Sequence, residues 1–87
     1  MNIKSKINQA KSLIELCKIL NDIEVEKLNN SDIQKEYETI DFLSLPTFGN
    51  NPLIIAEMVE INVYSWDNDN CLFQFETGDW SILEREK

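Results

Sequence analysis

The chain has 87 residues, of which 43% are hydrophobic and 28% are charged, a balance typical of a folded globular protein. This length suits one domain, residues 1–87, and leaves no room for a second. Sixteen acidic residues against eight basic residues give a net charge of −8, and a field of that sign repels the phosphates of nucleic acids and of anionic lipids. We therefore expect no direct binding of nucleic acid or membrane.

Apolar runs and cysteines indicate the compartment. The longest unbroken apolar run, residues 53–56, is far shorter than the ~20 residues that cross a bilayer, and the first residues lead into no secretory signal. We therefore expect a cytoplasmic protein. Its two cysteines, Cys17 and Cys71, are expected to be free thiols packed in the core.

The N-terminal segment has helical periodicity. From residue 3 to residue 20, apolar side chains form a wide stripe interrupted by lysines and other polar residues. This pattern predicts one amphipathic helix packed on the core. Residues 22–28 alternate like a strand and also contain helical neighbours, so their state stays open.

A short second helix is predicted after the break at Asn29-Asn30. Ser31 and Gln34 fit a capping box, in which the two side chains bind the free backbone amides at a helix start. The helix is expected to end at about residue 39. Its inner side is expected to carry Ile33, Tyr37 and Ile40.

A connector interrupts regular structure in the middle of the chain. Residues 45–52 contain two prolines, a glycine and two asparagines, so neither a helix nor a central strand can run through them. The connector is expected at about residues 42–58, between a helical part at about 1–41 and a β part at about 59–85. Phe48 is its expected anchor on the core.

The C-terminal part has the composition of strands. Three runs rich in β-branched and aromatic residues, at residues 59–66, 71–75 and 80–83, are separated by two turn sequences, at residues 67–70 and 77–79. They predict a three-stranded antiparallel meander. The expected fold class is therefore α+β, with an N-terminal amphipathic helix and a short second helix ahead of the sheet.

The second turn suggests how two of these strands pair. A two-residue loop at residues 77–78 would pair Phe75 with Trp80. The same register would pair Phe73 with Ile82, so that four large apolar side chains share the expected core face.

The register of the first hairpin stays open. A loop of two or four residues brings Tyr64 and Trp66 to the core face, whereas an odd loop or a bulge brings aliphatic side chains there instead: Val59, Ile61 and Val63. Either register leaves apolar side chains on the opposite face. We expect the connector or the second helix to cover that face, with a partner protein as the alternative.

Tests for known chemistry are negative. The sequence has no histidine, which removes the commonest general base and zinc ligand. Its two glycines, Gly49 and Gly78, are too far apart for a phosphate-binding loop. Residues 67–70 open like a calcium loop, but no glutamate closes it. We therefore expect no catalytic residue, no cofactor and no metal site.

Aromatic and acidic side chains around the two turns are candidates for contact with a partner. Aromatic residues supply binding hot spots, and acids complement a basic surface. The predicted contact residues are Tyr64, Trp66, Asp67, Asp69, Glu76, Asp79 and Trp80.

Three fragments of the C-terminal half form a signature: residues 45–49 (LPTFG), 64–67 (YSWD) and 80–85 (WSILER). On these fragments the chain resembles small, acidic, uncharacterised bacterial and phage proteins with an LPTFG…YSWD signature. Asn50 departs from the glycine that is more usual at its position. The resemblance implies a helical part ahead of the signature and supplies neither an activity nor a site.

These observations favour a non-catalytic protein-interaction module that binds a protein partner with a basic surface and modulates it by occlusion. A phage or mobile-element inhibitor of the anti-CRISPR or nucleic-acid-mimic type is one form of it. Two alternatives stay open. One is a homodimer with a structural or assembly role, and the other is an antitoxin or immunity protein.

Overall fold

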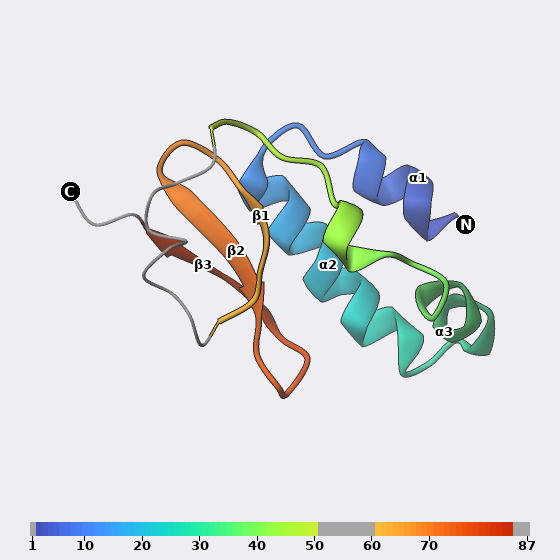
Figure 1. Cartoon of the computed structure of the whole chain (residues 1–87). Coiled ribbons are helices and arrows are strands. Elements are labelled where there is room, and N and C mark those ends of the chain that lie inside the picture. Colours follow the sequence, from blue (N-terminus) through green and yellow to red (C-terminus); the bar gives the residue numbers. More distant parts are fainter. Residues whose placement is uncertain (1, 51–60, 85–87) are drawn as a thin grey trace.

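The computed structural model describes residues 2–50 and 61–84 and has helices on one side of an antiparallel sheet (Figure 1). The elements follow in the order α1 (Ile3–Asn8), α2 (Leu13–Lys27), α3 (Ser31–Tyr37), the 3-10 turn η1 (Phe42–Ser44), β1 (Val63–Trp66), β2 (Asn70–Gln74) and β3 (Trp80–Glu84). The strand order is β1-β2-β3. The predicted α+β class, with helices ahead of a three-stranded meander, is confirmed.

The single N-terminal helix that the sequence predicts is two helices. The Ser12 side chain accepts the Glu15 N–H at 3.1 Å, and the Glu15 carboxylate accepts the Lys11 N–H at 2.7 Å, so α2 has its own capped start. Ala10 is buried within the break, which is why the apolar stripe conceals it. From this start α2 runs to Lys27, so the open segment 22–28 is helical up to its last residue.

The start of α3 differs from the predicted capping box. Asn30 is the N-cap, since its side chain accepts the N–H groups of Asp32 at 3.0 Å and Ile33 at 3.3 Å. Ser31 is instead the first helical residue, so the assignment of Ser31 as the cap is wrong. Asparagine is as good an N-cap as serine, and the sequence offers both side by side. The predicted inner residues, Ile33, Tyr37 and Ile40, do pack on the core.

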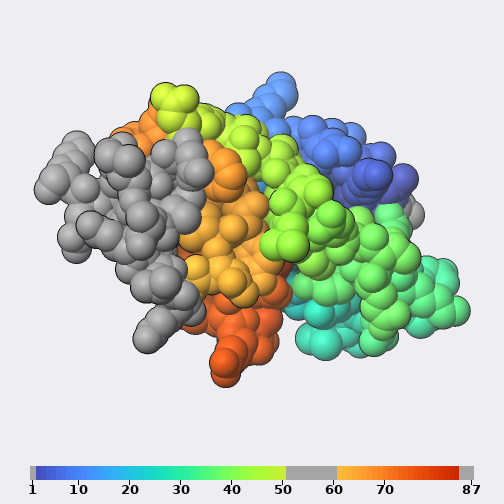
Figure 2. All heavy atoms as spheres, in the orientation of Figure 1, coloured from blue at the N-terminus to red at the C-terminus, as the bar shows by residue number. Residues whose placement is uncertain are grey.

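The core lies between the helices and the inner face of the sheet. The buried stripe of α2 consists of Leu13, Leu16, Leu20 and Ile23, and it meets Leu72 of β2 and two isoleucines of α1. Figure 2 shows residues 42–50 lying across the seam between the sheet and the helices. Phe48 packs against this core as predicted, and Leu45 is buried more deeply.

The β2–β3 register differs by one residue from the predicted one. Gln74 pairs with Trp80, and the connection is closed by hydrogen bonds from Gly78 N–H to Phe75 O at 2.9 Å and from Phe75 N–H to Asp79 O at 2.8 Å. Gly78 has a φ of 101°, which permits a turn followed by a glycine bulge instead of a two-residue loop. The predicted pairing of Phe75 with Trp80 is therefore wrong.

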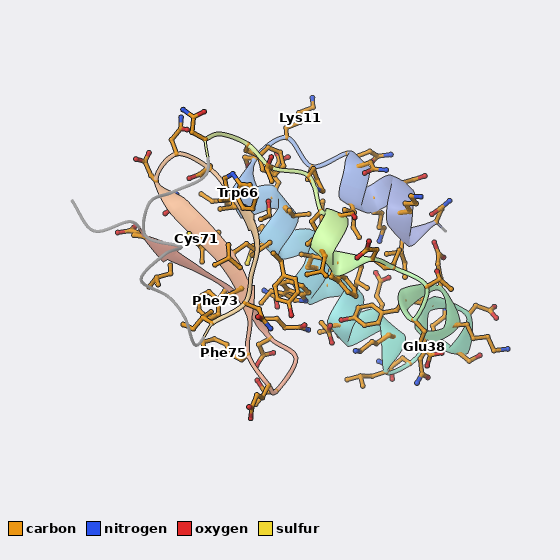
Figure 3. All side chains as sticks on the ribbon, viewed as in Figure 1. Lys11, Glu38, Trp66, Cys71, Phe73 and Phe75 are labelled. Carbon is orange, nitrogen blue, oxygen red and sulfur yellow. The ribbon has the colours of Figure 1, made fainter. Side chains whose placement is uncertain are left out.

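This one-residue shift moves phenylalanines to the outer face of the sheet. Leu72, Trp80 and Ile82 pack on the core, while Phe73 lies on the other face, beside Phe75 at 5.0 Å between ring centroids. Figure 3 shows both phenylalanines on the side that faces away from the helices. Phe73 and Phe75 are thus corrected from inner to outer positions.

A bulge answers the open question of the first hairpin. Val63 pairs with Phe73 and Ser65 with Leu72, so β1 has one extra residue between them. Ser65 is buried, and its hydroxyl donates to Pro46 O. Tyr64 packs on the core side, while Val63 lies opposite Phe73 on the outer face. The prediction that a bulge brings Val63 to the core face is therefore wrong. Of the other aliphatic residues considered, Val59 is outside the described residues and Ile61 is exposed.

No helix covers the outer face within residues 2–50 and 61–84. All of α1, α2 and α3 lie on the opposite side (Figure 1), so the prediction that the second helix covers this face is wrong. The connector remains untested in that role because residues 51–58 lie outside the described residues. Cys71 is buried and Cys17 half-buried, and both thiols are free as predicted.

The turn geometry at Gly78 makes a first prediction. Gly78→Ala should lower the free energy of unfolding by about 1–2 kcal/mol, because a Cβ is strained at positive φ. The new Cβ would also lie 3.3 Å from Glu24 Oε2. Urea denaturation measures the loss, with Glu76→Ala in the same turn as the control. A Gly78→Ala midpoint equal to that of the control would contradict the assigned turn.

Candidate functional site

The predicted contact residues fall at two opposite ends of the sheet. Trp66 ends β1, and Asp67 and Asp69 follow it in the β1–β2 turn, whereas Glu76 and Asp79 belong to the β2–β3 turn. Strand β2 runs from one turn to the other (Figure 1), and five strand residues at ~3.4 Å each separate them by about 17 Å. These residues therefore form two surfaces and not one.

Trp80 belongs to neither surface. It is 3% exposed, and its ring packs against Phe42 and Tyr64 at centroid distances of 5.5 and 5.1 Å. The Asn21 side chain holds its backbone, donating to Trp80 O at 3.0 Å and accepting the Trp80 N–H at 2.8 Å. A buried ring cannot form a contact surface, so Trp80 is corrected to a core residue, with the half-buried Tyr64 beside it.

The polar groups of the β1–β2 turn mainly hold the turn itself. Asp67 Oδ1 accepts the N–H groups of Asp69 at 2.8 Å and Asn70 at 2.7 Å. Asn68 Oδ1 accepts the Asn50 N–H at 2.8 Å, which ties the connector to this turn. Trp66 is half-buried and Asp69 is exposed. Asp67 is therefore a structural acid, and Asp69 is the exposed one.

The other end of the sheet has a hollow between the last turn of α2 and the β2–β3 turn. Val25, Leu28, Glu76, Thr77 and Asp79 lie in its lining, and we call these five residues the α2–hairpin surface. Val25 is 63% exposed and Leu28 is 79% exposed, and both acids are exposed. The surface thus combines apolar and acidic side chains that are all open to solvent.

Sequence reasoning missed Val25 and Leu28 because the state of residues 22–28 was open. With α2 continuing to Lys27, these two residues are neighbours at a spacing of i and i+3. They lie off the buried stripe that ends at Ile23. The signal was therefore present as two aliphatic residues outside the helical stripe.

Glu24 also lines this hollow and links α2, α3 and the sheet. Its carboxylate accepts the Tyr37 hydroxyl and, at 3.1 Å, Gln74 Nε2. Lys27 Nζ lies 2.8 Å from Glu24 Oε2 and 4.0 Å from the centroid of the Tyr37 ring. Gln74 Nε2 also donates to Gly78 O at 2.9 Å. This network fixes the β2–β3 turn relative to α2.

The network alters the ionisation of Tyr37. Burial, then the hydrogen bond to Glu24, raises the pKa of Tyr37 from 10.0 to about 12. The folded state therefore holds this proton more tightly than the unfolded chain does. The stability that this proton contributes is present below pH 10, and it is lost as the pH rises to about 12.

A tyrosine titration tests this shift directly. The sequence has two tyrosines, so in Tyr64→Phe the absorbance of tyrosinate reports Tyr37 alone. We expect half-ionisation near pH 12, with circular dichroism showing that the protein is still folded. Ionisation of Tyr37 near pH 10 in the folded protein would contradict both the burial of its hydroxyl and the hydrogen bond to Glu24.

A second hollow lies between α1, α3 and the segment that holds η1. Several of its polar groups satisfy the ends of these elements: Asn2 Oδ1 accepts the Lys4 N–H at 2.9 Å, and Asp41 Oδ1 accepts the Leu43 N–H at 3.0 Å. Glu36 Oε1 accepts the Ile3 N–H at 2.6 Å. These groups are used for structure, which makes this hollow the weaker candidate.

The described residues offer neither a metal site nor a membrane-spanning helix. In ranges 2–50 and 61–84, no three cysteine, aspartate or glutamate side chains are grouped so that they could hold a metal ion. Helices in these ranges are all too short or too polar to cross a bilayer. The α2–hairpin surface remains the candidate site.

Comparison with known proteins supplies no relative: no family model, no curated protein and no solved structure matches this chain. Function is therefore inferred from the side chains themselves.

Proposed function

We propose that this chain is a non-catalytic protein-interaction module that binds a partner with a basic surface and modulates it by occlusion. The supporting observation is the charge of the sheet. Residues 61–84 contain no lysine or arginine and carry five acids: Asp67, Asp69, Glu76, Asp79 and Glu84. Their negative charge favours a positively charged partner and steers its approach.

Ion pairs do not offset this charge within the described residues. The two salt bridges in ranges 2–50 and 61–84 are Lys6–Glu26 at 3.5 Å and Lys27–Glu24 at 2.8 Å, and both use acids of α2. Proteins that handle nucleic acid have positive surfaces for phosphates. A phage or mobile-element inhibitor that occupies such a surface, as an anti-CRISPR protein does, fits a compact acidic sheet of this kind.

A pull-down from the native host lysate tests the proposal. We expect the wild type to capture a basic protein at low salt and less of it at physiological salt, since exposed charges are screened. The variant D69N/E76Q/D79N should lose this capture. D22N/D32N/E38Q, which removes three exposed charges from the helical part of the chain, is the matched control and should retain this capture. Equal capture by the two variants would contradict binding through the sheet.

A homodimer is the second candidate, favoured by apolar side chains on the outer face of the sheet. Phe75 is 52% exposed, and Leu83 is partly exposed on the same face. Burial of such side chains between two copies would depend little on salt. Light scattering decides between the candidates: a dimer that persists at high salt, with no captured partner, would replace the interaction module by an assembly role.

A further inference from the structure

The C-terminal end of α2, with its C-cap Leu28, presents an apolar pair that the fold does not bury. Val25 and Leu28 are 63% and 79% exposed, although the same helix buries four aliphatic residues on its other side. A single exposed leucine is ordinary. Two adjacent exposed aliphatic side chains, beside a hollow lined by acids, resemble an interface, in which an apolar centre has a polar rim.

The charge of this hollow is negative. Its lining contains three acids, Glu24, Glu76 and Asp79, against one lysine, Lys27, which leaves a net charge of −2. Lys27 lies 2.8 Å from Glu24 and is the one lysine among the lining residues. The two acids of the lining that no lining lysine pairs with are therefore Glu76 and Asp79. The C-terminal end of α2 adds a partial negative charge. The hollow therefore favours a cation.

Both walls of the hollow are fixed before a partner arrives. Gln74 Nε2 donates both to Glu24 on α2 and to Gly78 O in the turn, and Asn21 on α2 binds the backbone of Trp80 at the start of β3. A preorganised surface loses less entropy on binding. The β2–β3 turn and α2 thus act as one rigid surface.

We propose, building on the function proposed above, that the α2–hairpin surface is the docking site and that its occupant is a basic amphipathic segment of the partner. An arginine or lysine of that segment lies between Glu76 and Asp79, and its aliphatic neighbour packs on Val25 and Leu28. Long basic side chains combine an apolar stem with a charged head, which matches an apolar wall beside two carboxylates.

Amide NMR of the full chain, titrated with a capped amphipathic peptide that carries arginine and leucine on one helical face, tests the site. We expect shifts at residues 24–29 and 76–80. The same peptide with citrulline in place of arginine should bind at least about tenfold more weakly, since about 1.4 kcal/mol corresponds to tenfold. Shifts centred on residues 66–70, or no binding at millimolar peptide, would overturn the proposal.

Two matched double variants separate the effect of the site from the effect of the overall charge. E76Q/D79N should weaken peptide binding about tenfold. D69N/E84Q makes the same charge change at the other end of the sheet, where Glu84 pairs with Asn70, and should change the affinity by less than about twofold. Equal weakening by both would overturn the assigned site and leave the proposed function intact.

The apolar half of the site has its own control. V25Q/L28Q should weaken peptide binding about tenfold. I14Q/L43Q removes two aliphatic side chains of similar exposure, 63% and 81%, from elsewhere on the surface and should have no effect. If V25Q/L28Q instead abolished self-association of the free chain, the occupant would be a second copy, and the proposal would fail.

Discussion

Trp80→Ala is expected to lower the free energy of unfolding by about 3–5 kcal/mol, the usual loss for a large aromatic side chain removed from a core. The Trp80 ring is 3% exposed and packs on Phe42 and Tyr64. Small domains are stable by only about 5–15 kcal/mol in total, so the variant should unfold at a much lower denaturant concentration. Guanidinium denaturation followed by circular dichroism measures the loss.

Trp66→Ala is the matched control, because Trp66 is half-buried at the end of β1. Trp66→Ala should lower the free energy of unfolding clearly less than Trp80→Ala does. A larger loss of unfolding free energy for Trp66→Ala than for Trp80→Ala would mean that Trp80 is a surface residue. The assignment of Trp80 to the core would then be wrong.

Glu24→Ala is expected to lower the free energy of unfolding by about 2–3 kcal/mol. The substitution removes the acceptor of the Tyr37 hydroxyl and of Gln74 Nε2, as well as the carboxylate beside Lys27. Hydrogen bonds to a charged group contribute about 1.5–3 kcal/mol, and a network loses more than one of them. Urea denaturation of the purified variant checks the value.

Two further substitutions show whether the network or the charge matters. Glu24→Gln keeps an oxygen acceptor, so it should lower the free energy of unfolding less than Glu24→Ala does. Glu26→Ala removes the other salt bridge, in which the Glu26 side chain is 41% exposed, and should cost less than about 1 kcal/mol. Similar losses for Glu24→Ala and Glu26→Ala would contradict the network as a link between α2, α3 and the β2–β3 turn.

Sequence periodicity predicted the kinds of element well and their boundaries less well. The meander follows from strand composition and turn residues, and the inner side of α3 follows from helical spacing. The break between α1 and α2 was missed because Ala10 continues the apolar stripe through it. Its signal is local, namely Ser12 and Glu15 at the spacing of a capping box.

Strand register depended on a single glycine. Both a two-residue loop and a turn followed by a bulge fit the sequence Thr77-Gly78-Asp79, and the two differ by one residue in pairing. The structure has the bulge, with Gly78 at a φ of 101°. Composition cannot distinguish the two turns, which is why Phe73 and Phe75 were predicted on the wrong face.

The candidate site was predicted in part. Glu76 and Asp79 were among the predicted contact residues, and they lie in the surface proposed here. A meander already places its two turns at opposite ends of the middle strand, so the separation of Asp69 from Glu76 follows from the predicted topology. Val25 and Leu28 required the length of α2, which the mixed periodicity of residues 22–28 did not define.

The affinity of the captured partner, measured against salt concentration, tests the central claim most directly. If the acids of the sheet dock a basic surface, the Kd should rise steeply between low and physiological salt, and D69N/E76Q/D79N should bind more weakly with a flatter salt dependence. An affinity that does not change with salt, together with a variant that binds as tightly as the wild type, would contradict docking through these acids.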